Sequence, residues 1–400
     1  MSVSAGRRVL ILVQNLPVPF DRRVWMEATT LQRAGYRVSV ICPKMKGQVA
    51  PREKLEGVEI YRYGMPFDPK TKLGFVGEYV YAFLRTFLLS AQVALAGRGF
   101  DVIHACNPPE TSWIIGRFWK LFGKRFIFDH HDLSPELYEV KFPGRQDLMY
   151  RFLRFMEKQT FRTSTVAIAT NESHKRVAIK RGAMDPNRVF VVRSGPSPER
   201  FRRYTADESW RRDCRFLVAY LGEIGHQDGV DALVRALAML RDEFGREDVQ
   251  GVFIGGGTYR EEVVRLAAEL GLEDRTTFTG VVSDDDLCRI LSSADIGVDP
   301  VPRSAWSERS TMNKVIEYQF FGLPVVAFDL TEARVSAGEA GAFAEGDTDK
   351  ALAACINDLL DDPQRRSQMS EAAVRHFHDD LSWDRSAPHL LAAYDAAFDR

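Results

Sequence analysis

Short apolar runs alternate with longer amphipathic segments along the first half of the chain. The apolar runs are rich in Val, Ile, Ala and Phe, which is typical of buried strands. Residues 23–34 have helical spacing, and Gly35 is placed to end that helix. Strands separated by helices predict parallel βαβ units. The expected strands are 9–13, 38–42, 102–104, 126–129, 166–169 and 189–192.

The same alternation restarts after a Gly/Pro-rich break at 193–198. We therefore predict an α/β fold of two doubly wound, Rossmann-like domains that face a central cleft, with domain bounds 1–195 and 196–380 and a terminal segment 381–400. The loops at the carboxyl ends of such strands are the usual ligand sites. The second half is expected to contain strands at 216–221, 251–254, 276–278, 296–298 and 325–328 and a closing helix at 385–398.

Composition supports a globular protein and exposes a charge asymmetry. The chain has 400 residues, of which 45% are hydrophobic and 27% charged, values that argue against disorder or a disulfide scaffold. Residues 1–200 contain 32 Lys and Arg against 18 Asp and Glu, a balance of +14, and the remaining 22 and 37 give −15. The basic half either attracts anions or is a solvated face. No nucleic-acid-binding motif accompanies it, so no nucleic-acid partner is expected.

The cysteines and the apolar stretches bear on location. Five cysteines lie far apart with no C-x-x-C pair, which suits a reducing cytoplasm and argues against structural zinc or disulfides. The run at 9–13 is too short for a signal-peptide core. The longest apolar stretch, 79–96, is interrupted by Arg85 and Gln92 and is too short to span a membrane. A cytoplasmic protein that is not integral to a membrane is expected.

The segment 302–324 is the most specific candidate for ligand binding. Ser310 or Thr311 can cap a helix, and Gly322 followed by Pro324 ends it. The N–H groups at such a helix start bind phosphate. The alternative is a capped surface helix with a Lys–Glu pair.

Charged and polar side chains surround that helix start. Arg309 and Lys314 add positive charge beside it. Asn313 and Glu317 stand four residues apart on one helical face. The Glu317 carboxylate can accept hydrogen bonds from vicinal hydroxyls such as those of ribose.

Two glycine-rich loops follow strands of the second half. Gly222, Gly225 and Gly229 precede a helix expected at 230–240, and the run 255–257, with Gly255 and Gly256, follows the next strand. Glycine lets the backbone approach a phosphate or a nucleobase closely. Such loops also serve as simple tight turns, and neither has the G-x-G-x-x-G spacing of a dinucleotide site.

Polar clusters follow strands of the first half. Asn15 follows the first strand, which ends without a glycine. The other candidates suit hydrogen bonding to a sugar or its acceptor: His104 and Asn107 in one loop, and His131, Asp132 and Glu136 in the next. The sequence 130–132 contains two histidines and an aspartate, but no third ligand has recognisable spacing, so no metal is expected.

Basic and aromatic residues are interleaved at 117–125 and 150–155. One interpretation is a peripheral contact with an anionic membrane. The other, which we place slightly ahead, is that the aromatic residues belong to the core and the cations face solvent.

Taken together, these motifs resemble the family 4 glycosyltransferases of the GT-B fold, of the bacterial surface-polysaccharide type. The resemblance spans nearly the whole chain. It rests on PFDRRVWMEATTLQRAGYRVSVICP, DVIHACNPPE, FDHHDLSPELY, QDGVD, FIGGG and STMNKVIEYQFFGLPVVAFD.

The resemblance implies transfer with retention of configuration, without a metal or other cofactor. A UDP- or GDP-linked sugar would be donor, and a glycan or polyprenyl-linked sugar acceptor. The closing helix would cross back onto the first domain. The implied catalytic residues are His131, Asp132 and Glu308, and the acceptor-binding residues are Asn15, His104, Asn107 and Glu136. The implied donor-binding residues are Gly222, Gly225, Arg193, Gly255, Gly256, Arg309, Ser310, Thr311, Asn313, Lys314 and Glu317.

The chain departs from the family pattern at three places. Arg309 stands where the first motif glutamate is usual, and Glu308 lies one residue out of register. Glu223 and Asp228 replace the usual Arg and Lys of the glycine loop, and Cys106 replaces the second histidine of an H-x-H pair. Losing two cations beside a diphosphate is a large electrostatic change.

We hypothesise that Arg309, Lys314, Arg193 and the helix N-terminus supply the missing positive charge. Two alternatives remain open. One is a nucleotide-sugar epimerase of the same fold, and the other is a non-catalytic partner protein that has lost donor binding.

Overall fold

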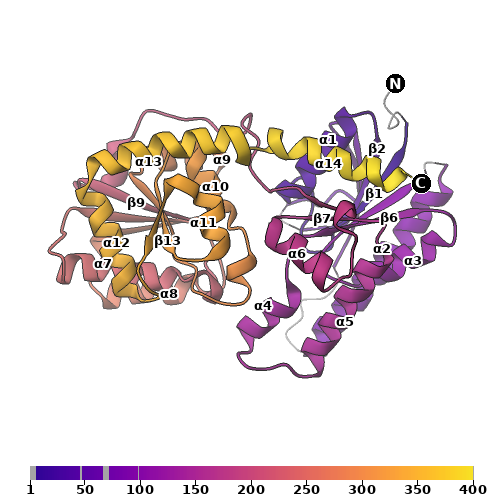
Figure 1. The fold of residues 1–400 in the computed structure, drawn as a ribbon, viewed down its shortest axis with the longest axis horizontal. Coiled ribbons are helices and arrows are strands. Elements are labelled where there is room, and N and C mark those ends of the chain that lie inside the picture. The colour runs from indigo at the N-terminus through magenta and orange to yellow at the C-terminus, as the bar shows by residue number, and fades with distance from the viewer. Residues whose placement is uncertain (1–5, 46, 66–71, 98, 400) are drawn as a thin grey trace. The chain divides into compact units, whose positions relative to one another are not determined.

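The computed structural model describes residues 6–45, 47–65, 72–97 and 99–399 (Figure 1). The chain divides into two compact units. Unit 1 comprises Met1–Ser194 and Ser386–Arg400, and unit 2 comprises Gly195–Arg385. The division falls inside the Gly/Pro-rich break, and the closing segment returns to unit 1.

Unit 1 is built on a largely parallel sheet with the strand order β3-β4-β2-β1-β5-β6-β7-β8. The reversal of strand order between β1 and β5 opens a crevice at the carboxyl ends of these two strands, the usual ligand position of a doubly wound sheet. The strands are β1 (Arg8–Leu12), β2 (Arg37–Pro43), β3 (Arg52–Leu55), β4 (Val58–Tyr63), β5 (Val102–Cys106), β6 (Arg125–His130), β7 (Val166–Ala169) and β8 (Val189–Val191).

The strand pair β3–β4 was not predicted from the sequence. β3 has the sequence REKL, is partly exposed, and pairs antiparallel with β4 at the sheet edge. A charged edge strand lacks the apolar run on which the prediction relied, and charge at an edge protects it from aggregation.

Helices of unit 1 begin and end at recognisable signals. The Asp21 carboxylate accepts a hydrogen bond from the Val24 N–H and caps α1, while Gly35 adopts φ +91° after its last turn, as expected. The helices are α1 (Arg22–Arg33), α2 (Lys72–Leu95), α3 (Ser112–Lys120), α4 (Ser134–Lys141), α5 (Leu148–Thr163) and α6 (Glu172–Lys180).

Unit 2 has a parallel sheet with the order β11-β10-β9-β12-β13-β14. Its strand order reverses between β9 and β12. The short β14, GAFA, was missed because its small residues carry no strand signal. The strands are β9 (Phe216–Leu221), β10 (Val249–Ile254), β11 (Thr276–Gly280), β12 (Ile296–Asp299), β13 (Val325–Phe328) and β14 (Gly341–Ala344).

The helices of unit 2 bury apolar faces on both sides of this sheet. They are α7 (Val230–Asp242), α8 (Arg260–Glu269), α9 (Asp284–Ser293), α10 (Asn313–Phe321), α11 (Thr331–Ala337), α12 (Asp349–Asp361) and α13 (Pro363–His376). The expected pair of doubly wound domains is confirmed.

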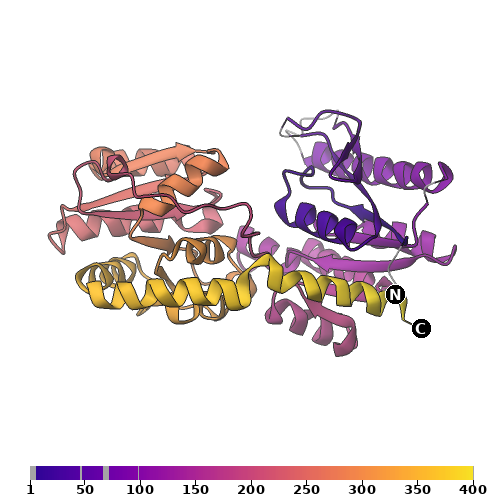
Figure 2. The ribbon, with the colours of Figure 1, turned by 90° about the horizontal axis from the view of Figure 1, so that it is seen from above.

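The closing helix α14 (Trp383–Phe398) packs its last turns against unit 1, where Figure 2 shows it in yellow. The Tyr394 hydroxyl lies 2.8 Å from Nδ1 of His104, and its ring packs edge-on to Tyr36. The Arg7 guanidinium covers the Phe398 ring at 3.8 Å. These contacts join the C-terminal segment to the core of the N-terminal sheet.

A search of the described helices for a membrane span, by length and hydropathy, finds none.

Candidate functional site

In unit 2, the candidate site lies at the strand-order reversal, where β9 and β12 end at Leu221 and Asp299. The backbone leaves β9 through Gly222 at φ +138°, a conformation that L-residues rarely adopt. The two glycine loops predicted from the sequence follow β9 and β10, which are adjacent strands. Topology thus places both loops at one edge of the sheet.

The two glycine loops are in direct backbone contact. The Gly222 N–H donates to the Ile254 carbonyl at 2.9 Å, and the Ile224 N–H donates to the Gly256 carbonyl at 2.8 Å. A Cβ on Gly255, at φ +135°, would lie 1.8 Å from the Gly222 carbonyl oxygen. Only glycine fits there, so at least part of this glycine usage serves close backbone packing.

The Lys314 side chain reaches this edge from the first turn of α10. Its Cε and Nζ lie 3.1 and 3.6 Å from where a Cβ of Gly222 would stand. Nζ is 3.5 Å from Oδ1 of Asp299, donates to the Tyr220 hydroxyl at 3.3 Å, and lies over the Tyr220 ring. An ammonium group is therefore held against the glycine loop that lacks its usual cations.

Carboxylates also surround Lys314. Asp299 is buried, and burial raises the pKa of its carboxyl although Lys314 opposes the shift. Asp228 accepts a hydrogen bond from the Gly225 N–H at 3.0 Å, and burial raises its pKa too, again opposed by Lys314. Asp228 thus stabilises the loop turn at a position where the family usually has a lysine, and Lys314 is the cation that balances it.

The start of α10 differs from the prediction. The helix begins at Asn313 with Met312 at the N-cap position, and Met312 makes no side-chain capping bond. The predicted cap by Ser310 or Thr311 is wrong, because 307–309 form a 3-10 turn and the Ser310 hydroxyl donates back to the Trp306 carbonyl at 2.8 Å. The predicted end at Gly322 is confirmed, at φ +73°.

Side chains around that start have different exposures. Asn313 is exposed, and Glu317, one turn further, is half-buried. Arg309 is half-buried, and its Nη1 donates to the Ala305 carbonyl at 3.0 Å. Their predicted contacts with a donor remain predictions.

Glu308 has structural partners. Its carboxylate accepts hydrogen bonds from the N–H and hydroxyl of Thr331 at 2.9 and 2.6 Å and pairs with Arg303. Partial burial alone would raise the pKa of Glu308, but these bonds lower it. Glu308 therefore ties the loop before α10 to the start of α11, and its predicted catalytic role remains a prediction.

In unit 1, several predicted residues meet at the carboxyl ends of β5 and β6. The Asn107 side-chain oxygen accepts from the N–H groups of His131 and Asp132 at 2.7 and 3.2 Å. Its amide nitrogen donates to the Asp132 carbonyl at 2.7 Å and to Glu110 at 3.0 Å. Burial raises the pKa of the Asp132 carboxyl. Asn107 thus fixes the loop that carries the two predicted catalytic side chains.

A buried ion network lies beneath that loop. Arg23, on α1, places Nη2 2.8 Å from Oδ1 of Asp129 and 3.1 Å from Oε1 of Glu27. Its Nε donates to Nε2 of His131 at 3.0 Å, and Nε2 of His104 lies 3.3 Å from Oδ2 of Asp129. The site residue His131 is therefore held by Arg23, which is not among the predicted site residues.

Burial and neighbouring charges shift the pKa values of the side chains in this network in different directions. Burial alone would raise the pKa of Asp129, but the charge of Arg23 holds that pKa well below its usual range. Burial and the Asp129 charge hold the pKa of Glu27 well above its usual range. Burial lowers the pKa of His104, which favours the neutral imidazole.

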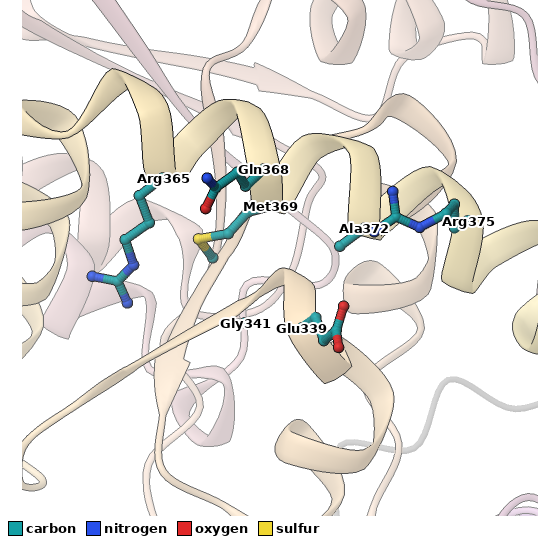
Figure 3. A pocket seen from close by; sticks show the side chains of 7 residues that line it. All are labelled: Glu339, Gly341, Arg365, Gln368, Met369, Ala372 and Arg375. Atoms are coloured by element: carbon teal, nitrogen blue, oxygen red, sulfur yellow. The ribbon is translucent and has the colours of Figure 1, made fainter.

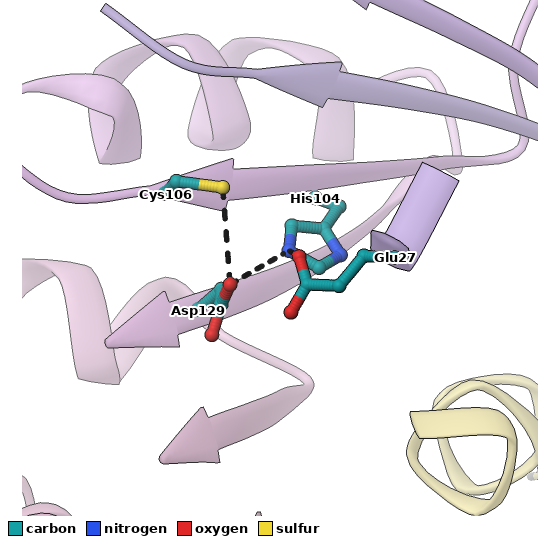
Figure 4. Close-up of side chains that lie close together, drawn as sticks. All are labelled: Glu27, His104, Cys106 and Asp129. Atoms are coloured by element: carbon teal, nitrogen blue, oxygen red, sulfur yellow. Dashed lines mark hydrogen bonds and ion pairs between the residues drawn. The ribbon is translucent and has the colours of Figure 1, made fainter. Parts of the chain in front are cut away.

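Four of these side chains are of types that bind metals. Figure 4 shows Glu27, His104, Cys106 and Asp129 converging, with their ligand atoms within 4.8 Å of one another. The Arg23 guanidinium already contacts both carboxylates. Burial also raises the pKa of Cys106 well above its usual range, which disfavours the thiolate that metals require. We interpret the cluster as an ion network centred on Arg23.

Among the remaining predicted residues of unit 1, His104 belongs to this network, and Glu136 pairs with Arg181. Both are buried, and their predicted contacts with an acceptor remain predictions. Asn15 is exposed just after β1. Arg193 is half-buried, and its Nη1 is buried without a hydrogen-bond partner among the described residues.

A surface pocket of about 360 Å³ in unit 2 lies between α13 and the start of β14 (Figure 3). It is lined by Glu339, Arg365, Met369 and Arg375, among others. None of the predicted donor residues lines it, so it is separate from the Lys314 site.

Comparison with known proteins identifies both units. The "Glycosyl transferase 4-like domain" model matches residues 21–195, and the "Glycosyl transferases group 1" model matches residues 215–362. A D-inositol 3-phosphate glycosyltransferase of Thermomonospora curvata is 26% identical over 396 residues, covering 93% of this chain and 89% of the relative.

Solved structures agree with the fold. Sucrose-phosphate synthase from Thermosynechococcus elongatus superposes with a TM-score of 0.77 at 19% identity, covering 97% of this chain and 98% of that one. Anabaena HepE in complex with UDP and glucose gives a TM-score of 0.72 at 16% identity, covering 98% and 100%. With two parallel-sheet units that match glycosyltransferase models in the expected order, this chain is a GT-B glycosyltransferase of the GT4-like kind.

Proposed function

We propose that the chain transfers a sugar from a nucleotide-diphosphate donor to a glycan or polyprenyl-linked acceptor, with retention of configuration and without a metal. The observation that carries the proposal is the Lys314 ammonium held against the Gly222 loop. A lysine at a glycine-rich turn is a standard way to bind phosphate. UDP and UDP-glucose occur in complexes of a protein with the same fold, which supports a UDP-linked donor.

In the proposed complex, the diphosphate lies at the Gly222 loop and the start of α10. Lys314 and Arg309 supply positive charge, and Glu317 accepts hydrogen bonds from the ribose hydroxyls. When Lys314 turns toward a phosphate, Asp299 and Asp228 lose part of their counter-charge, and their raised pKa values let them take up protons instead.

The transfer step breaks the bond between the sugar C1 and the diphosphate oxygen and forms a bond from C1 to the acceptor oxygen on the same face. The acceptor proton passes to the leaving diphosphate. We propose His131 and Asp132, on the loop held by Asn107, as catalytic residues. We further propose a role in cell-surface polysaccharide synthesis at the cytoplasmic face of the membrane.

Calorimetric titration with UDP, GDP, ADP and dTDP tests donor binding. We expect one nucleotide to bind, and Lys314→Ala and Arg309→Ala each to weaken it about tenfold or more, or about 1.4 kcal/mol. Lys350→Ala is the control, because Lys350 is an exposed lysine of the same unit paired with Glu243. Wild-type affinity in both test variants would refute the charge-replacement hypothesis.

Two further measurements separate the alternatives. Lys314→Ala removes the partner of buried Asp299, so circular dichroism must show that the variant is folded, and Glu317→Ala tests the site independently. Incubation of donor without acceptor reveals an epimerase by an isomerised nucleotide sugar. With an acceptor, NMR of the product reports the anomeric configuration, and inversion would contradict the proposed stereochemistry.

A further inference from the structure

Three helices of unit 1 carry large apolar side chains on their outward faces. On α2 they are Val80, Leu84 and Leu88, each 50–57% exposed and spaced four residues apart. Such spacing places them in one stripe along the helix. Because buried residues of the same helix, such as Ala82 and Val93, face the core, α2 has apolar residues on both its inner and its outer side.

The same outward stripe recurs on α3 and α5. Ile114, Phe118 and Phe122 follow one another at intervals of four along α3 and its end, and all are exposed. On α5 the stripe consists of Leu148, Phe152 and Phe155, which follow one another at intervals of four and three residues. The side chains of Phe152 and Phe155 are about half exposed. Scattered exposed apolar residues are ordinary, but stripes on neighbouring helices mark an interaction site.

These helices are neighbours in space, and Figure 1 shows them together in unit 1. The rings of Phe87 on α2 and Phe118 on α3 lie 5.0 Å apart. Nη2 of Arg117, on α3, donates to Gln159, on α5, at 2.7 Å. The three helices are therefore neighbours, and we call their exposed apolar and basic side chains together the α2–α3–α5 face.

Nearly all the exposed charges beside the apolar stripes of α3 and α5 are basic. The stretch 112–163 is described throughout, and in it every exposed ionisable side chain except Asp147 is basic. On α5, the exposed residues Arg151, Lys158 and Arg162 lie on the same outward face as Phe152 and Phe155. The exposed cations of the stretch are Arg117, Lys120, Lys141, Arg145, Arg151, Lys158 and Arg162.

We propose that the α2–α3–α5 face docks on the surface of an anionic lipid bilayer. Phe and Leu side chains enter the boundary between headgroups and acyl chains, and the flanking Lys and Arg contact anionic headgroups. A second copy of the chain fits less well, because a two-fold contact would bring the same cations of both copies together. The inference is independent of the donor site, which lies in unit 2.

Vesicle flotation tests this proposal with the full chain. We expect it to float with vesicles of phosphatidylcholine and phosphatidylglycerol at low salt, and to remain below with phosphatidylcholine alone. Arg151→Glu/Lys158→Glu/Arg162→Glu should lower the partition coefficient about tenfold or more. Phe152→Ser/Phe155→Ser tests the apolar contribution separately and should also weaken binding.

Matched controls lie in unit 2. Arg265→Glu/Arg375→Glu reverses two exposed cations there, and Val281→Ser removes an exposed apolar side chain. Both should float like wild type. The proposal would be overturned if the wild type failed to float with the anionic vesicles. It would also be overturned if the unit 2 controls lost as much vesicle binding as the α5 variants. A dimer in light scattering that the α5 variants dissociate, without flotation, would assign the face to a second copy and also overturn it.

Discussion

At the scale of single residues, the candidate sites depend on buried charges whose partners come from distant parts of the chain. Lys314 balances Asp299 and Asp228, and Arg23 balances Asp129 and Glu27. In both places burial makes an unpaired charge costly, so the cation stabilises the fold as well as orienting functional groups. Substituting either cation is therefore expected to affect stability as well as activity.

Arg23→Ala is expected to destabilise unit 1 by roughly 3–5 kcal/mol, because it leaves a buried carboxylate without its cation. It also removes donors to the Val192 carbonyl and the Ser194 hydroxyl. Urea denaturation, with hydrogen exchange at β5 and β6 as the probe of unit 1, measures the change.

The control for this variant is Arg8→Ala. Arg8 pairs with Asp101 at 3.0 Å, but both side chains are about one-third exposed, so a loss of less than about 1 kcal/mol is expected. Equal losses of unfolding free energy in Arg23→Ala and Arg8→Ala would show that the buried Arg23 network stabilises unit 1 no more than an exposed ion pair does.

At the scale of elements, the glycine loops after β9 and β10 form one packed unit rather than two independent turns. Gly222, Gly255 and Gly257 all adopt φ between +135° and +158°, and added Cβ atoms at Gly255 and Gly257 would meet the other loop's backbone. The site edge is thus shaped by backbone contact before any side chain contributes. Lys314 then enters from a third element, α10.

Gly255→Ala should lower the free energy of unfolding of unit 2 by roughly 2–6 kcal/mol, from backbone strain and overpacking. The added Cβ would lie 1.8 Å from the Gly222 carbonyl oxygen. Gly245→Ala is the control, since Gly245 also has a positive φ, of +67°, but no atom lies within 4 Å of the added Cβ. Its cost should be about 1–2 kcal/mol. Urea denaturation measures the free energy of unfolding of both variants. Equal losses in Gly255→Ala and Gly245→Ala would contradict the packing argument.

At the scale of the whole molecule, each unit has its own sheet and core, but unit 1 is completed by the end of the chain. Tyr394 and Phe398 contact His104 and Arg7, which belong to the N-terminal segments. Unit 1 therefore joins segments that are far apart in sequence, since His104 and Tyr394 are 290 positions apart.

Deletion of residues 386–400 is expected to destabilise unit 1 selectively. The buried Nδ1 of His104 would lose the Tyr394 hydroxyl, and Arg188 would lose the Ala396 carbonyl. Hydrogen exchange should accelerate in β1, β5 and β6 while β9, β10 and β12 keep wild-type protection. Unchanged exchange in unit 1, or equal acceleration in both units, would contradict this assignment.

The sequence by itself determined the alternation of strands and helices, the break at 193–198 and the resemblance to GT-B glycosyltransferases. Strands such as β7 and β9 were predicted at their observed bounds, because hydrophobic runs and glycine stops are local signals. The edge strand β3 and the small-residue strand β14 were missed, since pairing with neighbours forms them rather than their own composition.

Only the tertiary structure decided which candidate residues come together. The sequence named Lys314 and Gly222 separately, and the fold brings them into contact because α10 begins beside the ends of β9 and β12. It also revealed the contacts of Arg23, which lies inside a quoted motif but was not named as a site residue, and of Asp299, which lies outside the quoted motifs. Which side chains are buried, and hence which charges must be paired, depends on contacts between distant segments and is not encoded in any short stretch of sequence.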